Sequence, residues 1–178
     1  MKKIILFLMV ACTTFSCCNN DDNKTIAEID KLPPLTTTGT NKAGCLVNGV
    51  AFLPKGYSPN GSNTQVYYDG ENFTLSITEN LNGELRNFLL AYKNELLQEG
   101  INYQLTENFN TNLQTPFGYV FFTDSNSEFN TNETNYGELK IVNHNYEEAI
   151  ISGIFWADAI NNDGEKVEIR EGRFDMKY

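Results

Sequence analysis

The chain has 178 residues and a formal net charge of −10 at pH 7, because 23 Asp and Glu residues outnumber 13 Lys and Arg residues. That length corresponds to one domain of ordinary size, and a hydrophobic content of 40% argues against a disordered chain. The acid excess argues against a nucleic-acid partner, since binding to phosphates requires clustered Lys and Arg.

The first residues are typical of an export signal. Lys2 and Lys3 precede an unbroken apolar run over residues 4–11, which is too short to span a bilayer because a spanning helix needs about 20 residues. A charged start, a short apolar stretch and small residues form the arrangement of a signal peptide. A buried N-terminal helix is the alternative, but the run at residues 19–23 is polar and acidic. We therefore predict that residues 1–16 are a signal peptide.

The cysteine that follows indicates the kind of export. Thr14-Phe15-Ser16-Cys17 resembles a bacterial lipobox, in which a small residue precedes a cysteine that becomes lipidated, although Thr14 stands where Leu is usual. Asp21-Asp22 resemble the acidic address that directs Bacteroidetes lipoproteins to the outer face of the outer membrane. We predict that Cys17 is the lipid anchor and that the protein lies on the outer membrane, exposed at the cell surface. The periplasmic face is the alternative.

Residues 17–42 are predicted to form a flexible tether. They are polar, contain Pro33-Pro34 and lack a sustained apolar period. Cys18 lies in this tether, whereas Cys45 lies in an apolar stretch. An oxidising compartment permits a disulfide between the two, but Cys45 is better interpreted as a small buried hydrophobic residue.

Residues 43–178 alternate between apolar and polar side chains with the period of two that β-strands require. Phe73, Leu75 and Ile77 are one such apolar row, and turn pairs such as Asn48-Gly49 separate the runs. The pattern predicts an all-β domain, an antiparallel β-sandwich or partly closed barrel of about ten strands. Residues 94–99 are the only helix-like piece. The strands are expected near 44–48, 50–54, 64–69, 72–79, 84–93, 101–105, 117–123, 137–143, 149–158 and 165–177.

The last of these strands is expected to contain a β-bulge. Val167 and Ile169 face one side, whereas the apolar set resumes at Phe174, one position out of phase. An extra residue at Glu171-Gly172 restores the alternation, and the glycine suits the left-handed conformation found in bulges.

No recognisable catalytic, cofactor-binding or metal-binding set occurs in the sequence. His144 is the only histidine, and we expect it in a solvated loop because no nucleophile motif accompanies it. Glu147-Glu148 are neighbours on a predicted strand edge and would face opposite sides rather than converge as a glycosidase pair. The loop around Gly164 fails the calcium-loop template, because positions 159 and 170 carry Ala and Arg. A non-enzymatic domain without a cofactor is therefore expected.

The aromatic residues remain as candidates for binding. One of Tyr67-Tyr68 should face outward, and the aromatic residues within 117–122 should cover both faces of their strand. An exposed aromatic row stacks on sugar rings or anchors a protein partner; the alternative is that other strands cover both faces. We expect Trp156 to lie in the core, together with Ile154 and Phe155.

Two stretches near the C-terminus carry a resemblance. Ile151-Ser152-Gly153-Ile154-Phe155, then Gly164, then Glu171-Gly172-Arg173-Phe174-Asp175 resemble an uncharacterised family of Bacteroidetes, largely flavobacterial, lipoproteins. The stretch Gly44-Cys45-Leu46-Val47-Asn48-Gly49 is similar to the first hairpin of that family. The resemblance implies an exported β-rich domain of unknown function, with no catalytic residues to carry over.

The sequence thus predicts a membrane-anchored lipoprotein whose non-enzymatic β domain binds a glycan or another envelope protein. Two other classes stay open: a hydrolase that acts on polysaccharide or peptide through carboxylates, and a purely structural or assembly factor.

Overall fold

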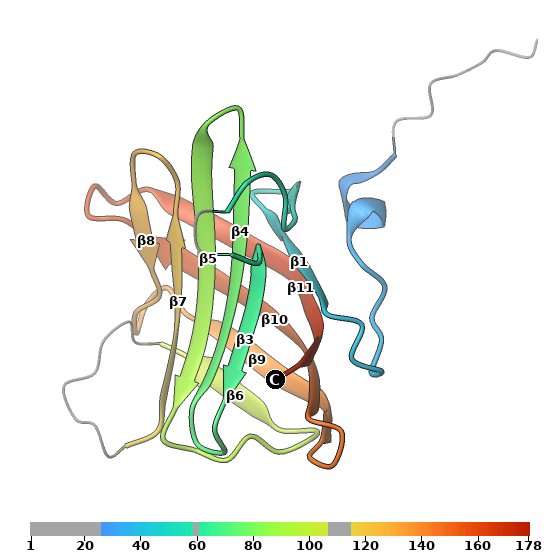
Figure 1. Cartoon of the computed structure of the whole chain (residues 1–178). Helices are drawn as coiled ribbons and strands as arrows, with labels where there is room; N and C mark the ends of the chain where they lie inside the picture. The colour runs from blue at the N-terminus through green and yellow to red at the C-terminus, as the bar shows by residue number, and fades with distance from the viewer. Residues whose placement is uncertain (1–25, 59–60, 107–114) are drawn as a thin grey trace, which may run out of the picture.

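A computed structural model describes residues 26–58, 61–106 and 115–178. It confirms the all-β class, with eleven strands in one antiparallel sheet that is not closed (Figure 1). The strands are β1 (Lys42–Val47), β2 (Val50–Phe52), β3 (Thr64–Tyr68), β4 (Phe73–Leu81), β5 (Glu84–Lys93), β6 (Asn102–Leu105), β7 (Phe117–Thr123), β8 (Glu128–Asn130), β9 (Gly137–Asn145), β10 (Ile150–Ile160) and β11 (Lys166–Lys177). A single turn of 3-10 helix, η1 (Glu28–Lys31), precedes them.

Ten strands match those expected from the sequence, and β8 is additional. Its three residues are too few to show an alternation. The prediction of a helix-like piece at 94–99 is wrong, because these residues form an irregular connection between β5 and β6. Asn94 takes a left-handed φ of 63°, which a helix cannot continue through, and Leu97 is fully buried.

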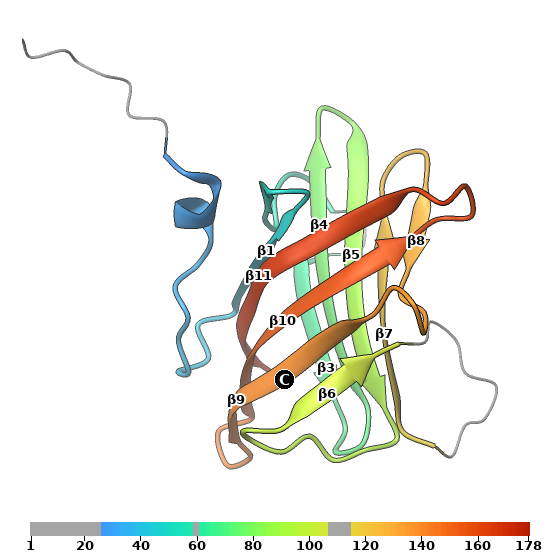
Figure 2. The same ribbon diagram turned by 180° about the vertical axis from the view of Figure 1, so that it is seen from behind.

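The sheet folds over itself into two facing layers (Figures 1 and 2). The order of strands is β2-β1-β11-β10-β8-β7-β5-β4-β3, with β9 paired to β10 and β6 paired to β9. The sheet divides at β10, because residues 150–157 pair with β9 whereas Ile160 pairs with Asn130 of β8. One layer therefore contains β3, β4, β5, β7 and β8, and the other contains β2, β1, β11, β10, β9 and β6.

The core lies between the layers and is rich in aromatic rings. Phe88 of β5 stacks on Phe155 of β10 with ring centroids 5.0 Å apart, and Phe73 of β4 lies 5.4 Å from Phe174 of β11. The predicted row Phe73, Leu75 and Ile77 is fully buried. Cys45 is also fully buried, as predicted. Its alternative disulfide partner, Cys18, lies outside the described residues.

Tight turns join the strands where the sequence predicted them. Asn48 and Gly49 have φ values of 49° and 79° between β1 and β2, and Asn82 and Gly83 have 55° and 89° between β4 and β5. Asparagine and glycine tolerate this left-handed conformation, which two-residue hairpins require. The turn at 161–164 also forms, with the Asn161 carboxamide oxygen accepting two backbone N–H groups.

The bulge in β11 is confirmed, but its glycine has a different role from the one expected. Phe155 of β10 pairs with Gly172 and Ala157 pairs with Ile169, so two residues of β11 stand opposite one residue of β10. Glu171, not Gly172, takes the left-handed conformation, with φ of 54°. Gly172 is needed for space, because a Cβ atom there would overlap the ring of Phe155.

Residues 26–41, named here the N-terminal strap, lie against the domain (Figure 1). Thr36, Gly39 and Thr40 donate hydrogen bonds to the buried carboxylate of Asp175 on β11, at 2.7 to 3.1 Å. The sequence assigned this stretch to the flexible tether at 17–42. These hydrogen bonds, together with one from the backbone N–H of Ala51 to the Glu28 carboxylate, hold the strap on the domain. Nowhere in the described ranges does the chain form a helix of the length and apolarity that crossing a bilayer requires.

Candidate functional site

A groove of about 510 Å³ lies on the outer face of the layer formed by β9, β10 and β11. Figure 2 looks onto the side of the molecule where these strands and β6 run side by side. The outer groove has an apolar floor and charged walls: Ile154 and Trp156 come from β10, Glu138 and Lys140 from β9, and Arg170 and Arg173 from β11. Leu35 of the strap lines it as well.

Trp156 is the largest side chain of the groove, and its placement corrects the sequence-based expectation. Only Phe155 of the predicted core triplet is buried, at 3% exposure; Ile154 is 39% exposed and Trp156 is half-buried on the outer face. Three consecutive apolar residues carry no alternation, so the sequence could not tell which of them faces inward.

The bulge in β11 explains why Trp156 lies at a hollow. In the pairing of β10 with β11, the register shifts between Phe155 and Ala157, so Trp156 faces two residues, Arg170 and Glu171, instead of a single partner. A bulge bends its strand and increases the local twist. The sequence pattern predicted this bulge as a feature of the architecture only, and its consequence for Trp156 was not foreseen.

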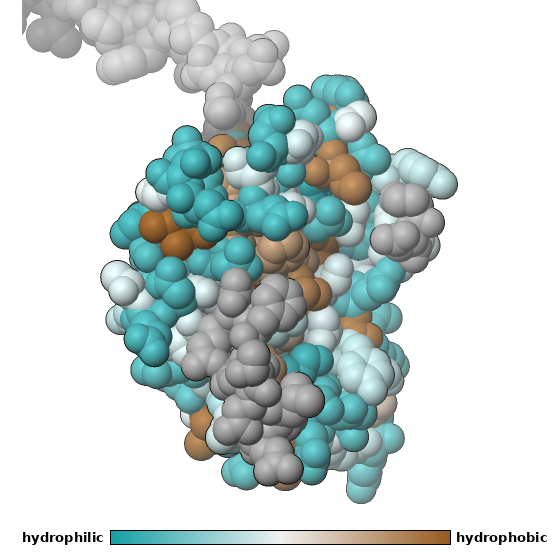
Figure 3. All heavy atoms as spheres, turned by 90° about the vertical axis from the view of Figure 1, so that its left-hand side faces the viewer, coloured by the Kyte–Doolittle hydropathy of each residue, from teal (hydrophilic) through white to brown (hydrophobic). Residues whose placement is uncertain are grey.

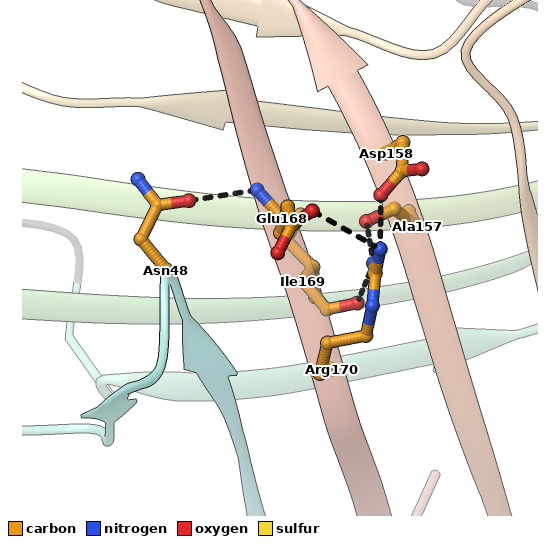
Figure 4. A network of polar contacts seen from close by, with 6 residues as sticks. All are labelled: Asn48, Ala157, Asp158, Glu168, Ile169 and Arg170. Atoms are coloured by element: carbon orange, nitrogen blue, oxygen red, sulfur yellow. Dashed lines mark hydrogen bonds and ion pairs between the residues drawn. The ribbon is translucent and has the colours of Figure 1, made fainter.

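Arg170 lines the groove and is held by a network of polar contacts (Figure 4). Its Nη2 lies 2.5 Å from Oδ1 of Asp158 and 3.8 Å from Oε1 of Glu168. Its Nη1 donates to the backbone oxygens of Ala157 and Ile169, both at 2.9 Å. The guanidinium carbon lies 5.6 Å from the ring centre of Trp156, in the range of a cation–π contact. Because its donors are engaged by protein groups, Arg170 orients the indole.

The two remaining cations of the groove are less engaged. Arg173 donates through Nε to the backbone oxygen of Glu171 and through Nη2 to its carboxylate, both at 3.1 Å. Lys140 is exposed and forms no ion pair with any residue that the structure describes. Both side chains stand beside Ile154, because Ile154 pairs with Arg173 on one side and with Lys140 on the other.

His144 does not lie in a solvated loop, as the sequence suggested, but within β9. Its Nδ1 lies 2.9 Å from the backbone oxygen of Leu97 and its Nε2 lies 3.2 Å from the hydroxyl of Tyr178. The ring stacks on Tyr146 at 3.9 Å. Burial lowers the pKa of His144. This histidine therefore ties the 94–100 connection to the end of the chain, on a different part of the sheet from the outer groove.

The other aromatic candidates lie on the opposite layer. Tyr67 is 56% exposed whereas Tyr68 is buried, as the alternation predicted. Phe117 and Phe121 are half-buried on the outer face of β7, and Phe122 points into the core, so the aromatic residues cover both faces of that strand. On the side of the molecule shown in Figure 3, hydrophobic residues form small patches among hydrophilic ones.

The remaining acidic candidates stay at the surface. Glu147 and Glu148 are exposed in the turn between β9 and β10, where both backbone N–H groups donate to the Asn145 side chain. In the described part of the chain, no three His, Cys, Asp or Glu side chains gather in a way that could hold a metal ion. Cys17, the predicted lipidation site, lies outside the described residues.

No protein-family model matches the chain, and no curated protein or solved structure matches it. The resemblance to Bacteroidetes lipoproteins therefore stays a prediction from the sequence. The function has to be argued from the geometry of the outer groove.

Proposed function

We propose that this chain is an exported lipoprotein whose β domain binds a glycan in the outer groove without catalysing a reaction. The observation that carries the proposal is Trp156, a half-buried indole in a preformed hollow with Ile154 beside it. Large aromatic side chains are ordinarily buried, so an indole oriented by Arg170 on an outer face favours a binding role.

The chemistry of the groove suits a sugar ring. A sugar offers an apolar face of C–H groups, which packs on an aromatic ring, and a rim of hydroxyls, which hydrogen-bonds to charged and amide side chains. Trp156 and Ile154 supply the apolar floor, whereas Glu138, Lys140 and Arg173 supply acceptors and donors around it. A few polar groups around an apolar floor are typical of small-ligand sites, and the volume of the groove is typical as well.

Binding screens with purified polysaccharides test the proposal. We expect the wild-type domain to be retarded in gels that contain its polysaccharide, and Trp156→Ala to abolish the retardation. Tyr67→Ala is the matched control, because it removes an exposed aromatic ring from the opposite layer. Retardation of Trp156→Ala equal to that of Tyr67→Ala and the wild type would contradict a glycan site in this groove.

A carboxylate hydrolase is the second candidate, and it is favoured by the two acidic residues that line the same groove. Glu138 lies on β9 and Glu171 in the bulge of β11, and the Glu171 carboxylate is bonded to Arg173. Release of reducing ends from a bound polysaccharide, lost in Glu138→Gln, would establish hydrolysis and overturn the non-enzymatic part of the proposal. We expect no release from either protein.

We propose further that Cys17 anchors the domain to the outer membrane at the cell surface. The support comes from the lipobox-like sequence and from Asp21-Asp22 after it. Two or more acyl chains hold a protein stably on a bilayer, whereas one does not. Cys17→Ala should therefore move the protein to the soluble or unprocessed fraction, and Cys18→Ala should leave it in the membrane fraction. A mature N-terminal peptide without lipid, identified by mass spectrometry, would contradict the anchor.

A further inference from the structure

We propose that the glycan bound in the outer groove is acidic, with its anionic group held above Ile154 between Lys140 and Arg173. This inference rests on the proposed function, and it specifies the class of glycan. The ligand is a sugar that carries an anionic group, either a carboxylate or a sulfate. The experiment below distinguishes the two groups.

The register of three strands places the two cations on either side of Ile154. Ile154 of β10 pairs with Arg173 of β11 and with Lys140 of β9, and residues paired across antiparallel strands point to the same face. Neighbouring strands lie about 4.8 Å apart, so the two cationic side chains start about 10 Å apart with Ile154 midway between them. An anionic group above Ile154 therefore meets a cation on each side.

Both cations have donors available for a ligand. Lys140 has three ammonium hydrogens and no ion pair with a described residue. Arg173 has five N–H groups, of which Nε and Nη2 bond to Glu171. Arg170, in contrast, is bound by Asp158 and by backbone oxygens, so it does not supply this contact.

Arg173, Ile154 and Lys140 form one row of paired residues across β11, β10 and β9. The acidic residues of the groove lie outside this row. Glu138 pairs with Trp156, one row further along the strands, and Glu171 is bonded to Arg173. The chain as a whole has 13 Lys and Arg residues against 23 acidic ones, and three of those cations line this single groove. An acidic polymer that binds such a protein needs a local cation pair to overcome the general repulsion.

Strand β6 extends the same rows toward the edge of the sheet. Asn102 pairs with Lys140 and Gln104 pairs with Glu138, and both amide side chains are exposed. Amides donate and accept hydrogen bonds, as sugar hydroxyls do. The surface therefore offers successive contacts to an oligosaccharide that runs across the strands from Arg173 to Asn102.

Calorimetric titration of the folded domain with polygalacturonate, dextran sulfate and neutral dextran tests the inference. We expect one of the two acidic polymers to bind, and Lys140→Gln to weaken it about tenfold or more, since a hydrogen bond to a charged group contributes about 1.5–3 kcal/mol. Lys166→Gln is the control, because it removes the same charge from an exposed position of β11 outside the groove. Raising NaCl from about 50 to about 300 mM should weaken binding as well, since salt screens exposed charges.

The outcomes separate the inference from the function on which it rests. Polygalacturonate binding identifies a carboxylate ligand and dextran sulfate binding a sulfate ligand. Binding of neutral dextran that depends on Trp156 but not on Lys140 overturns the acidic ligand and leaves the glycan site intact. If no polymer binds, or if Trp156→Ala binds as well as the wild type, both the inference and the proposed function fail.

Discussion

At the scale of single residues, Asp175 connects the strap to the last strand. Its carboxylate accepts six hydrogen bonds, among them those of Thr36, Gly39 and Ser152. Burial alone would raise the pKa of Asp175, but the hydrogen bonds outweigh it and hold the pKa well below its usual range. The contact between the strap and Asp175 could not be predicted from the sequence, because the strap donors lie more than 130 residues from Asp175.

Asp175→Asn should lower the free energy of unfolding by about 2–3 kcal/mol, because the amide replaces an ionised acceptor and turns a donor toward other donors. Denaturant unfolding measures the loss. Asp163→Asn, at an exposed turn, is the control and should change the free energy of unfolding little. An Asp175→Asn variant as stable as the wild type would show that the strap is held by other contacts.

His144 should make stability depend on pH. Burial lowers its pKa in the folded protein, so the unfolded chain binds the proton more tightly and stability falls as the pH falls through about 6.5. His144 is the only histidine, so His144→Gln should remove the dependence between about pH 7.5 and pH 5.5. The measurement is the melting temperature across that range. A slope that persists in the variant would assign the titration to another group.

At the scale of elements, β-strands were predictable because alternation and turn pairs are local signals. Phe73, Leu75 and Ile77 alternate with polar residues, and Asn48-Gly49 marks a hairpin. Two features were not local. Trp156 faces outward by the alternation of β10, but the hollow beside it depends on a register shift against β11, and the helix-like residues 94–99 form a loop in which Leu97 is buried.

Gly172→Ala tests the packing that forms the bulge. The added methyl group would overlap the Phe155 ring, so we expect a loss of about 1–3 kcal/mol in unfolding free energy. The double variant Gly172→Ala/Phe155→Leu should be less destabilised than the sum of the two single variants, since the smaller side chain vacates the space. Strict additivity in this double-mutant cycle would contradict the contact.

At the scale of the whole molecule, β11 connects the parts of the protein. It pairs with β1 and β10, its Asp175 holds the strap, and its bulge forms one side of the groove. The candidate site could not be predicted from the sequence, because Lys140, Trp156 and Arg173 converge only when three strands pair in a specific register. What the sequence did predict was the bulge in β11, as a feature of the architecture and not as part of a site.

Removing residues 173–178 should unfold the domain. Phe174 and Met176 are buried at 1% and 3% exposure, and each buried large side chain contributes about 1.5–3 kcal/mol against a total stability of about 5–15 kcal/mol. Circular dichroism melting of the truncated chain checks this. An unchanged melting temperature would show that the end of β11 does not contribute to stability.

The fluorescence of Trp156 tests the central claim most directly, because Trp156 is the only tryptophan of the chain and lies in the outer groove. A glycan that covers the half-buried indole removes water from it. We therefore predict that titration with the bound polysaccharide shifts the emission to shorter wavelength and saturates with the affinity measured by calorimetry. A polysaccharide that binds the domain while the emission of Trp156 stays unchanged would contradict the account.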